Sequence, residues 1–344
     1  MYDMENLIIT FILGLSVMFF GMTSWLFSRK GGRLSVIVAC LMVILGAQCL
    51  MSMCFIFKDV YLDPHYWTIL TSIDLCAVPF YALILRELVR PGSVTWKTGV
   101  INILPFIVFP ALYIAIGWYP LYLFTVVGCA IYGVSYFIWT LINIRIYNRR
   151  LKEQYSFTEN INLNWLRLIL IFFLVLMSVW IIDTMAIYSY MDCVYLLMSM
   201  TLWMVIDYFI YKHEMEMESL NATQSEEEPS AEPPMSELGA KIERLFTEER
   251  IYLNPNLKIS DVAAAVGSNR TYVSNYFNRE ASTTFYDYVN ALRVECACDL
   301  LQKTQDSVKV IAERAGYNSP QAFIRVFSKI KGISPSEFRQ RTNV

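Results

Sequence analysis

Six residues near the C-terminus can present hydrogen-bonding groups and a positive charge along one face of a helix. Within residues 308–339 the spacing of apolar residues predicts a helix that begins at Pro320. The face of this helix opposite its apolar residues carries an amide, a guanidinium, a hydroxyl and an ammonium group. These groups suit contacts with base edges and phosphates in DNA. The candidate DNA-binding residues on this helix are Pro320, Gln321, Ile324, Arg325, Ser328 and Lys329.

Such a face needs a rigid support, and the surrounding residues predict one. A short helix containing Val310, Ile311 and Ala315 comes first, and Gly316 ends it because glycine adopts left-handed backbone angles without strain. Ser319 and Pro320 then read as the N-cap and first residue of the second helix. The predicted buried face of that helix consists of Ala322, Phe323, Val326 and Phe327. This layout predicts a helix-turn-helix.

A second copy of the layout lies about fifty residues upstream. Its supporting helix is predicted over 259–266 with Ser260 as N-cap, and Gly267 ends it. Asn269 then caps a helix whose inward face is predicted to be Tyr272, Val273, Tyr276 and Phe277. The candidate DNA-binding residues on its outward face are Arg270, Thr271, Ser274, Asn275 and Asn278. A long helix from about Phe285 to Gln302 is expected to connect the two copies rigidly.

Together these residues resemble the DNA-binding domain of the AraC/XylS transcription regulators. The second copy contains I-A-x-x-x-G-Y, F-x-R-x-F and G-x-S-P-x-x-F-R in order, and the first contains Y-V-x-x-Y-F and F-x-x-Y-V-N-x-x-R. The resemblance covers the last third of the chain. It implies that two recognition helices enter successive major-groove segments about 34 Å apart. In that family the arginine of F-x-R-x-F faces either DNA or the domain core, so both placements of Arg325 stay open.

Two residues of the first copy depart from the family pattern. The family usually has arginine where Asn275 stands, and asparagine suits adenine better than guanine or phosphate. The family usually has glycine where Ser282 stands, which predicts a slightly altered turn within the same fold.

Composition divides the chain into three parts. The 344 residues are 56% hydrophobic, whereas soluble domains are usually about 45–50% apolar. Residues 1–211 carry 12 basic and 11 acidic groups, residues 212–234 carry 1 and 7, and residues 235–344 carry 15 and 12. This order predicts a membrane domain, an acidic flexible linker and a nucleic-acid-binding domain.

Seven apolar segments are each close to the length of about 20 residues that a bilayer core requires. Basic residues gather in the loops after the first, third and fifth segments, which places those loops and the C-terminal domain inside the cell. We therefore expect a multi-pass protein of the bacterial inner membrane with its N-terminus outside. The predicted extents are 6–27, 34–57, 66–88, 98–117, 120–143, 165–187 and 192–211.

Two acidic residues within these segments are candidates for sensing a ligand. An acidic group at membrane depth is costly, so Asp74 in the third segment and Asp183 in the sixth are functional candidates. The alternatives are structural. Asp183 also lies close enough to the outer end of its segment to reach the interface, and Asp207 can pair with Arg86 or Arg167 at the inner face.

No enzyme motif is found in the sequence. Gly-rich phosphate loops, HExxH and GxSxG are absent, and the cysteines and histidines lack metal-ligand spacing, so no catalytic residue, cofactor or metal is predicted.

The sequence therefore predicts an all-α protein with three parts, namely a seven-span sensor at 1–211, a linker at 212–234 and a double helix-turn-helix domain at 235–344. It predicts a membrane-anchored one-component transcription regulator. The expected partners are double-stranded DNA, the lipid bilayer, RNA polymerase, a signal ligand and, through the membrane part, a second copy of the chain. Two alternatives are a transporter or receptor whose cytoplasmic domain binds a protein partner, and a regulator released by proteolysis of the linker.

Overall fold

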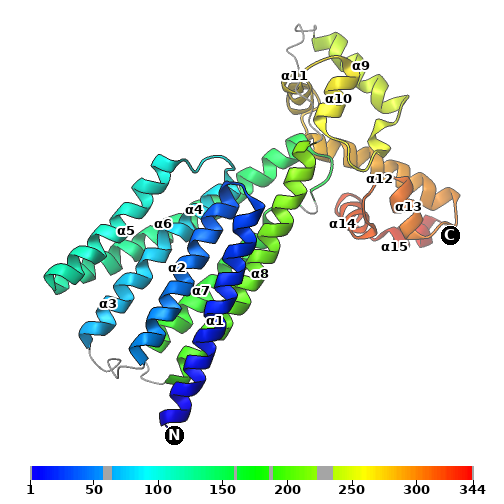
Figure 1. The fold of residues 1–344 in the computed structure, drawn as a ribbon. Coiled ribbons are helices and arrows are strands. Elements are labelled where there is room, and N and C mark those ends of the chain that lie inside the picture. The colour runs from blue at the N-terminus through cyan, green and yellow to red at the C-terminus, as the bar shows by residue number, and fades with distance from the viewer. Residues whose placement is uncertain (1, 57–63, 159–160, 186–188, 223–234, 343–344) are drawn as a thin grey trace. The chain divides into compact units, whose positions relative to one another are not determined.

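The computed structural model describes residues 2–56, 64–158, 161–185, 189–222 and 235–342 (Figure 1). Every regular element in these ranges is helical, which agrees with the predicted all-α class. The chain forms two compact units. Unit 1 comprises Met1–Tyr147 and Leu163–Ile210, and unit 2 comprises Asn148–Asn162 and Tyr211–Val344.

Unit 1 is built from long apolar helices. Six of them, within the described residues, have the length and composition needed to cross a membrane, and the described apolar part of a further helix is shorter, at Asn164–Val175. Sequence reasoning predicted seven such segments. The helices of this part of the chain are α1 (Tyr2–Lys30), α2 (Arg33–Ile56), α3 (Pro64–Asp74), η2 (Leu75–Ala77), α4 (Val78–Val89), α5 (Trp96–Ile116), α6 (Tyr119–Gln154), α7 (Asn164–Met185) and α8 (Ser189–Ala222).

The third predicted segment is not one continuous α-helix. It consists of α3 and α4 joined by the 3-10 turn η2, and Pro79 lies in the first turn of α4. A proline has no amide hydrogen and clashes with the preceding helical turn, so the helix is interrupted just before it. By contrast, Pro105 and Pro110 both lie inside the single helix α5.

Helix α6 extends eleven residues beyond its predicted end at residue 143. The expected basic loop after the fifth segment is therefore helical as far as Gln154. Arginine, leucine, lysine, glutamate and glutamine are all good helix formers, which explains the extension. Arg149 also pairs with Glu153 one turn later, with 3.5 Å between Nε and Oε1.

Unit 2 contains the two predicted helix-turn-helix copies. Its connecting helix matches the predicted range closely, starting at Phe285 and ending at Lys303 rather than Gln302. The helices of this unit are α9 (Met235–Thr247), η3 (Ile251–Leu253), α10 (Ile259–Val266), α11 (Arg270–Asn275), η4 (Tyr276–Glu280), α12 (Phe285–Lys303), α13 (Val308–Arg314), α14 (Pro320–Lys331) and α15 (Pro335–Thr342).

Two hydrophobic cores stabilise unit 2, and α12 contributes to both. Phe285 and Val289 near its start pack with α9, α10 and α11, whereas Ala297 and Leu301 near its end pack with α13 and α14. Each fully buried aromatic or aliphatic side chain contributes roughly 1.5–3 kcal/mol. One rigid helix anchored in both cores fixes the two copies to each other.

One local expectation is corrected in this unit. The N-cap of α10 is Lys258 rather than Ser260, because the amide of Lys258 donates to the Asp261 carboxylate at 2.8 Å and that bond starts the helix two residues earlier. On α13, Ile311 and Ala315 are buried, but Val310 is exposed.

Candidate nucleic-acid interface

Helix α14 begins as its sequence predicts, and it ends at a glycine. The hydroxyl of Ser319 accepts from the amide of Ala322 at 3.2 Å, Pro320 occupies the first turn, and Gly332 ends the helix with φ 76°. The predicted inward face is confirmed, since Ala322, Phe323, Val326 and Phe327 are all buried. A helix held along one whole side leaves its opposite side available to a partner.

None of the eleven candidate DNA-binding residues is buried, so all of them lie on the surface side of their helices. Arg325 is exposed, which removes the alternative that it faces the domain core. The exposed candidates are Arg270, Thr271, Asn278, Gln321, Ile324, Arg325 and Lys329, and the half-buried ones are Ser274, Asn275, Pro320 and Ser328.

The recognition helix of the first copy is shorter than predicted. Asn269 caps α11 as expected, because its side-chain oxygen accepts from the amide of Tyr272 at 3.1 Å. After Asn275 the backbone continues as the π-helical turn η4, in which the amide of Ala281 donates to the carbonyl of Tyr276 at 3.1 Å. The wider turn is a difference from the single α-helix that residues 270–280 predict.

Ser282 follows this turn in a left-handed conformation, with φ 50°. The AraC/XylS family usually has glycine at this position. Ser282 therefore adopts the backbone conformation that glycine would adopt there, although it has a side chain. Two candidate contacts on the same copy also touch each other, since the amide of Asn278 donates to the hydroxyl of Ser274 at 3.2 Å.

The turn of the second copy packs closely against the first copy. Gly316 has φ 83°, and a β-carbon placed there would lie 2.7 Å from the carbonyl oxygen of Leu253. Two residues later, the side-chain amide of Asn318 donates to the carbonyl of Pro255 at 3.1 Å and to the side chain of Asn256 at 3.0 Å. The turn of the second copy is therefore packed on residues 253–256, which lead into α10 of the first copy.

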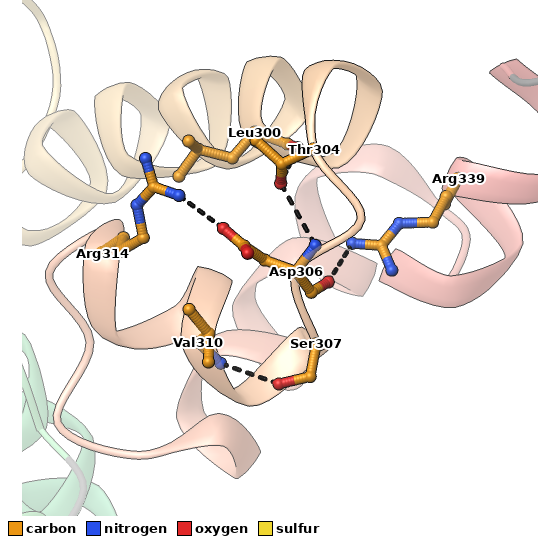
Figure 2. Close-up of polar contacts among 7 residues, drawn as sticks. All are labelled: Leu300, Thr304, Asp306, Ser307, Val310, Arg314 and Arg339. Carbon is orange, nitrogen blue, oxygen red and sulfur yellow. Dashed lines mark hydrogen bonds and ion pairs between the residues drawn. The ribbon is translucent and has the colours of Figure 1, made fainter.

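Asp306 organises the start of the second copy (Figure 2). Its carboxylate pairs with Arg314 of α13, and its carbonyl accepts from Arg339 of α15 at 2.6 Å. Next to it, the hydroxyl of Ser307 caps α13 by accepting from the amide of Val310 at 3.3 Å. The bond to Asp306 gives Arg339 a structural role in this unit.

A buried arginine at the middle of α12 is the main polar feature that sequence reasoning missed. Arg293 is only 1% exposed, and its Nε donates to the carbonyl of Tyr252 at 2.7 Å. One of its terminal nitrogens donates to the carbonyl of Asn254, also at 2.7 Å, and the guanidinium lies 5.5 Å from the ring centre of Tyr317. The sequence does contain a hint of this role. Arg293 is the arginine of F-x-x-Y-V-N-x-x-R and lies among apolar residues of a helix, where a buried guanidinium requires hydrogen-bond acceptors.

The phenol of Tyr276 stays neutral in the hydrophobic core that α9, α10 and α11 form with the start of α12. Burial raises the pKa of Tyr276 to about 12, and the nearby Tyr288 phenol and Glu243 carboxylate act in the same direction. Its hydroxyl lies 3.5 Å from Oε1 of Glu243, to which it donates. The core below α11 therefore keeps its charge state at physiological pH.

The structure describes the side chain of only one of the two candidate sensing residues. Asp74 is the last residue of α3 and is exposed at the surface of unit 1, whereas the side chain of Asp183 lies outside the described residues. Among the residues described, His, Cys, Asp and Glu side chains form no group of three that could hold a metal ion.

Comparison with known proteins supports the assignment of the C-terminal region. Residues 262–341 match the family described as "Helix-turn-helix domain". The C-terminal region is an AraC-type helix-turn-helix domain. Its relatives are transcription regulators, and the family implies binding to double-stranded DNA.

Three comparisons illustrate the extent of the similarity. The melibiose operon regulatory protein of Escherichia coli (strain K12) is 36% identical over 84 residues, which cover 24% of this chain and 28% of that protein. The MmsAB operon regulatory protein of Pseudomonas aeruginosa is 29% identical over 108 residues, 31% of this chain and 35% of that protein. The C-terminal domain of the response regulator yesN from Fusobacterium nucleatum is 28% identical, with 28% of this chain and 93% of that chain covered and a TM-score of 0.27.

The matched region spans only 11% to 36% of the length of the first curated relatives. These relatives therefore describe the helix-turn-helix part of the chain and leave the apolar helices of unit 1 without a counterpart.

Proposed function

We propose that the protein is a membrane-anchored, one-component transcription regulator. This proposal rests on two features that occur in one chain. One is a pair of surface-facing recognition helices on a shared rigid helix, and the other is a set of six helices, within the described residues, that are long and apolar enough to cross a membrane. The apolar part senses a signal, and the AraC-type domain binds DNA sequence-specifically. Asp74 and Asp183 remain the candidate sensing residues.

In this proposal α11 and α14 enter successive segments of the major groove. Gln321 and Arg325 on α14 read base edges, and Lys329 neutralises a phosphate. On α11, Arg270 and Asn275 have the corresponding roles, with asparagine favouring adenine. The exposed faces of both helices support this assignment.

The test is selection of DNA from a random library by the full-length protein in nanodiscs, followed by affinity measurement. Enrichment of a defined sequence is expected. Arg325→Ala should weaken binding to that sequence by about 1–3 kcal/mol and relax the preference at one position. Arg244→Ala is the matched control, since it removes an exposed arginine from α9, outside both copies. Failure to enrich any sequence, or equal losses in the two variants, would refute sequence-specific reading through α14.

A further inference from the structure

The chain enters unit 2 at two places. Besides Tyr211–Val344, this unit includes Asn148–Asn162, which we call the α6–α7 segment because it consists of the last turns of α6 and the chain that leads on to α7. The predicted domain division places this segment with the membrane part. Its contacts within unit 2 show why it belongs with the DNA-binding helices.

Ser156 is the centre of these contacts and is 1% exposed. Both its amide and its hydroxyl donate to the carbonyl of Leu257, at 3.1 Å and 2.8 Å. Beside it, Tyr155 and Lys258 form an antiparallel bridge. The segment is thus paired, backbone to backbone, with the residues that lead into α10.

On its other side Ser156 meets the buried polar residues of α12. Its carbonyl accepts from Asn290 at 3.2 Å and from Arg293 at 3.3 Å, and its hydroxyl lies 3.1 Å from the second terminal nitrogen of Arg293. Arg293 is the residue that also binds the carbonyls of Tyr252 and Asn254. One guanidinium therefore holds the first copy and the α6–α7 segment together, while its face packs on Tyr317 of the second copy.

A second set of contacts lies near the start of α12. Nζ of Lys152 is 3.9 Å from the carboxylate of Asp287 and 4.9 Å from the ring centre of Tyr286. Burial raises the pKa of Tyr155, and the charge of Arg270 at the start of α11 partly opposes that shift. The segment thus touches α12 at two points and approaches the N-terminus of α11.

These contacts are costly to lose. Removing Ser156 from its place would leave two guanidinium nitrogens of Arg293 and the amide of Asn290 with fewer partners in a buried site. Buried donors without acceptors, and charged ones above all, are strongly unfavourable. Arg293 would then move, and with it the junction between the two copies.

We propose that the α6–α7 segment is a docked positioning element of the DNA-binding unit, in which Ser156 holds Arg293 and thereby fixes the angle between α11 and α14. This inference rests on the proposed DNA-binding function. According to this inference, the α6–α7 segment determines which spacing between the two bound DNA segments the protein prefers. A displacement of the segment would alter that spacing preference.

Docking is tested without DNA by cross-linking in the full-length chain. The paired variant Tyr155→Cys with Lys258→Cys is oxidised in native membranes after a protease site has been placed within residues 223–234. Antiparallel partners have Cα atoms about 4.5–5.5 Å apart, which a disulfide spans. We expect cleavage to leave the two fragments linked on a non-reducing gel.

The matched control is Gln154→Cys with Lys258→Cys, because Gln154 is the exposed neighbour of Tyr155. It should give separate fragments, as should the parent chain with its native cysteines. Hydrogen exchange on the unaltered chain is the second measurement, and the Ser156 amide should exchange slowly. Rapid exchange at Ser156, or equal cross-linking in the two cysteine pairs, would overturn docking.

Positioning is tested with the DNA sequence that the full-length protein selects. Affinity is compared between that DNA and the same DNA with about five base pairs, half a helical turn, inserted between the two contacted segments. The parent chain and Gln154→Leu should prefer the original spacing. In Ser156→Leu the ratio of the two affinities should fall by about tenfold, equivalent to 1.4 kcal/mol, with a smaller fall in Ser156→Ala.

The ratio separates positioning from stability, because a variant that merely unfolds loses affinity for both DNA molecules equally. An equal loss, or tighter binding of both molecules, would overturn the positioning role. If the parent chain selects no DNA, the proposed function and the positioning role both fail, whereas the cross-link still reports whether the segment is docked.

Discussion

Ser282 shows how a single residue can depart from a sequence pattern while the fold is kept. With φ 50° it occupies a region of backbone space that costs a residue with a β-carbon about 1–2 kcal/mol. The π-helical turn η4 and the first core hold it there, since the amide of the adjacent Thr283 donates to the carbonyl of Phe277 at 3.0 Å. The strain is local, and glycine would relieve it.

Ser282→Gly should therefore stabilise unit 2 by about 0.5–1 kcal/mol, the strain relieved minus the entropy that glycine gains in the unfolded chain. Ser274→Gly is the matched control, because the same substitution inside α11 should destabilise by about 0.5 kcal/mol. Pulse proteolysis of the full-length protein in detergent, followed at unit 2, measures both. A loss of stability in Ser282→Gly would contradict the strain argument.

Two glycines with similar backbone angles allow a second comparison at this scale. Gly332, with φ 76°, has open space where a β-carbon would be, whereas a β-carbon at Gly316 would collide with the backbone of Leu253. Gly332→Ala should cost about 1 kcal/mol from backbone strain, and Gly316→Ala about 3 kcal/mol or more because overpacking adds to it. The same proteolysis assay gives both free energies of unfolding. Similar costs in the two variants would argue against close packing of the second turn on the first copy.

Among the elements, α14 was predicted almost completely from sequence, and the reason is physical. Its cap, its first proline and its buried stripe are all local signals, and Ser319, Pro320 and Phe323 act as those signals predict. The third apolar segment and the first recognition helix were predicted less well. Pro79 interrupts its helix, whereas Pro105 leaves α5 continuous, and this difference depends on packing partners that are distant in the sequence. The widening of the helix after Asn275 depends on such partners too.

The charge on α14 leads to a prediction about salt. Its last turn carries Lys329 and Lys331, both exposed. If Lys329 neutralises one phosphate, Lys329→Ala should reduce the slope of log affinity against log salt by about 0.9. Lys241→Ala, which removes an exposed lysine from α9, should leave the slope unchanged. Fluorescence anisotropy of the selected DNA at several salt concentrations measures the slope, and equal slopes for the parent chain and Lys329→Ala would rule out that contact.

For the whole molecule, the most informative feature is that unit 2 is assembled from two separate stretches of the chain. Sequence reasoning predicted three parts from composition and charge, but it did not predict that residues 148–162 belong with unit 2. Ser156 and Arg293 are 137 residues apart, and no sequence pattern connects them. A hydrogen-bonded contact at such a separation is specified by the fold and has no local signature. The contact between Ser156 and Arg293 also provides a test of the alternative in which proteolysis of the linker releases a soluble regulator.

If the α6–α7 segment is docked, cutting the chain within residues 223–234 should not release the C-terminal fragment. The fragment should sediment with the membranes, because Ser156 and Lys152 still bind α12 after the covalent connection is lost. Ser156→Leu should shift it to the soluble fraction, whereas Gln154→Leu should not. Immunoblotting of membrane and soluble fractions after cleavage at an inserted protease site measures this. Complete release from the parent chain would favour the proteolytic alternative, since a severed linker alone would then free the DNA-binding unit.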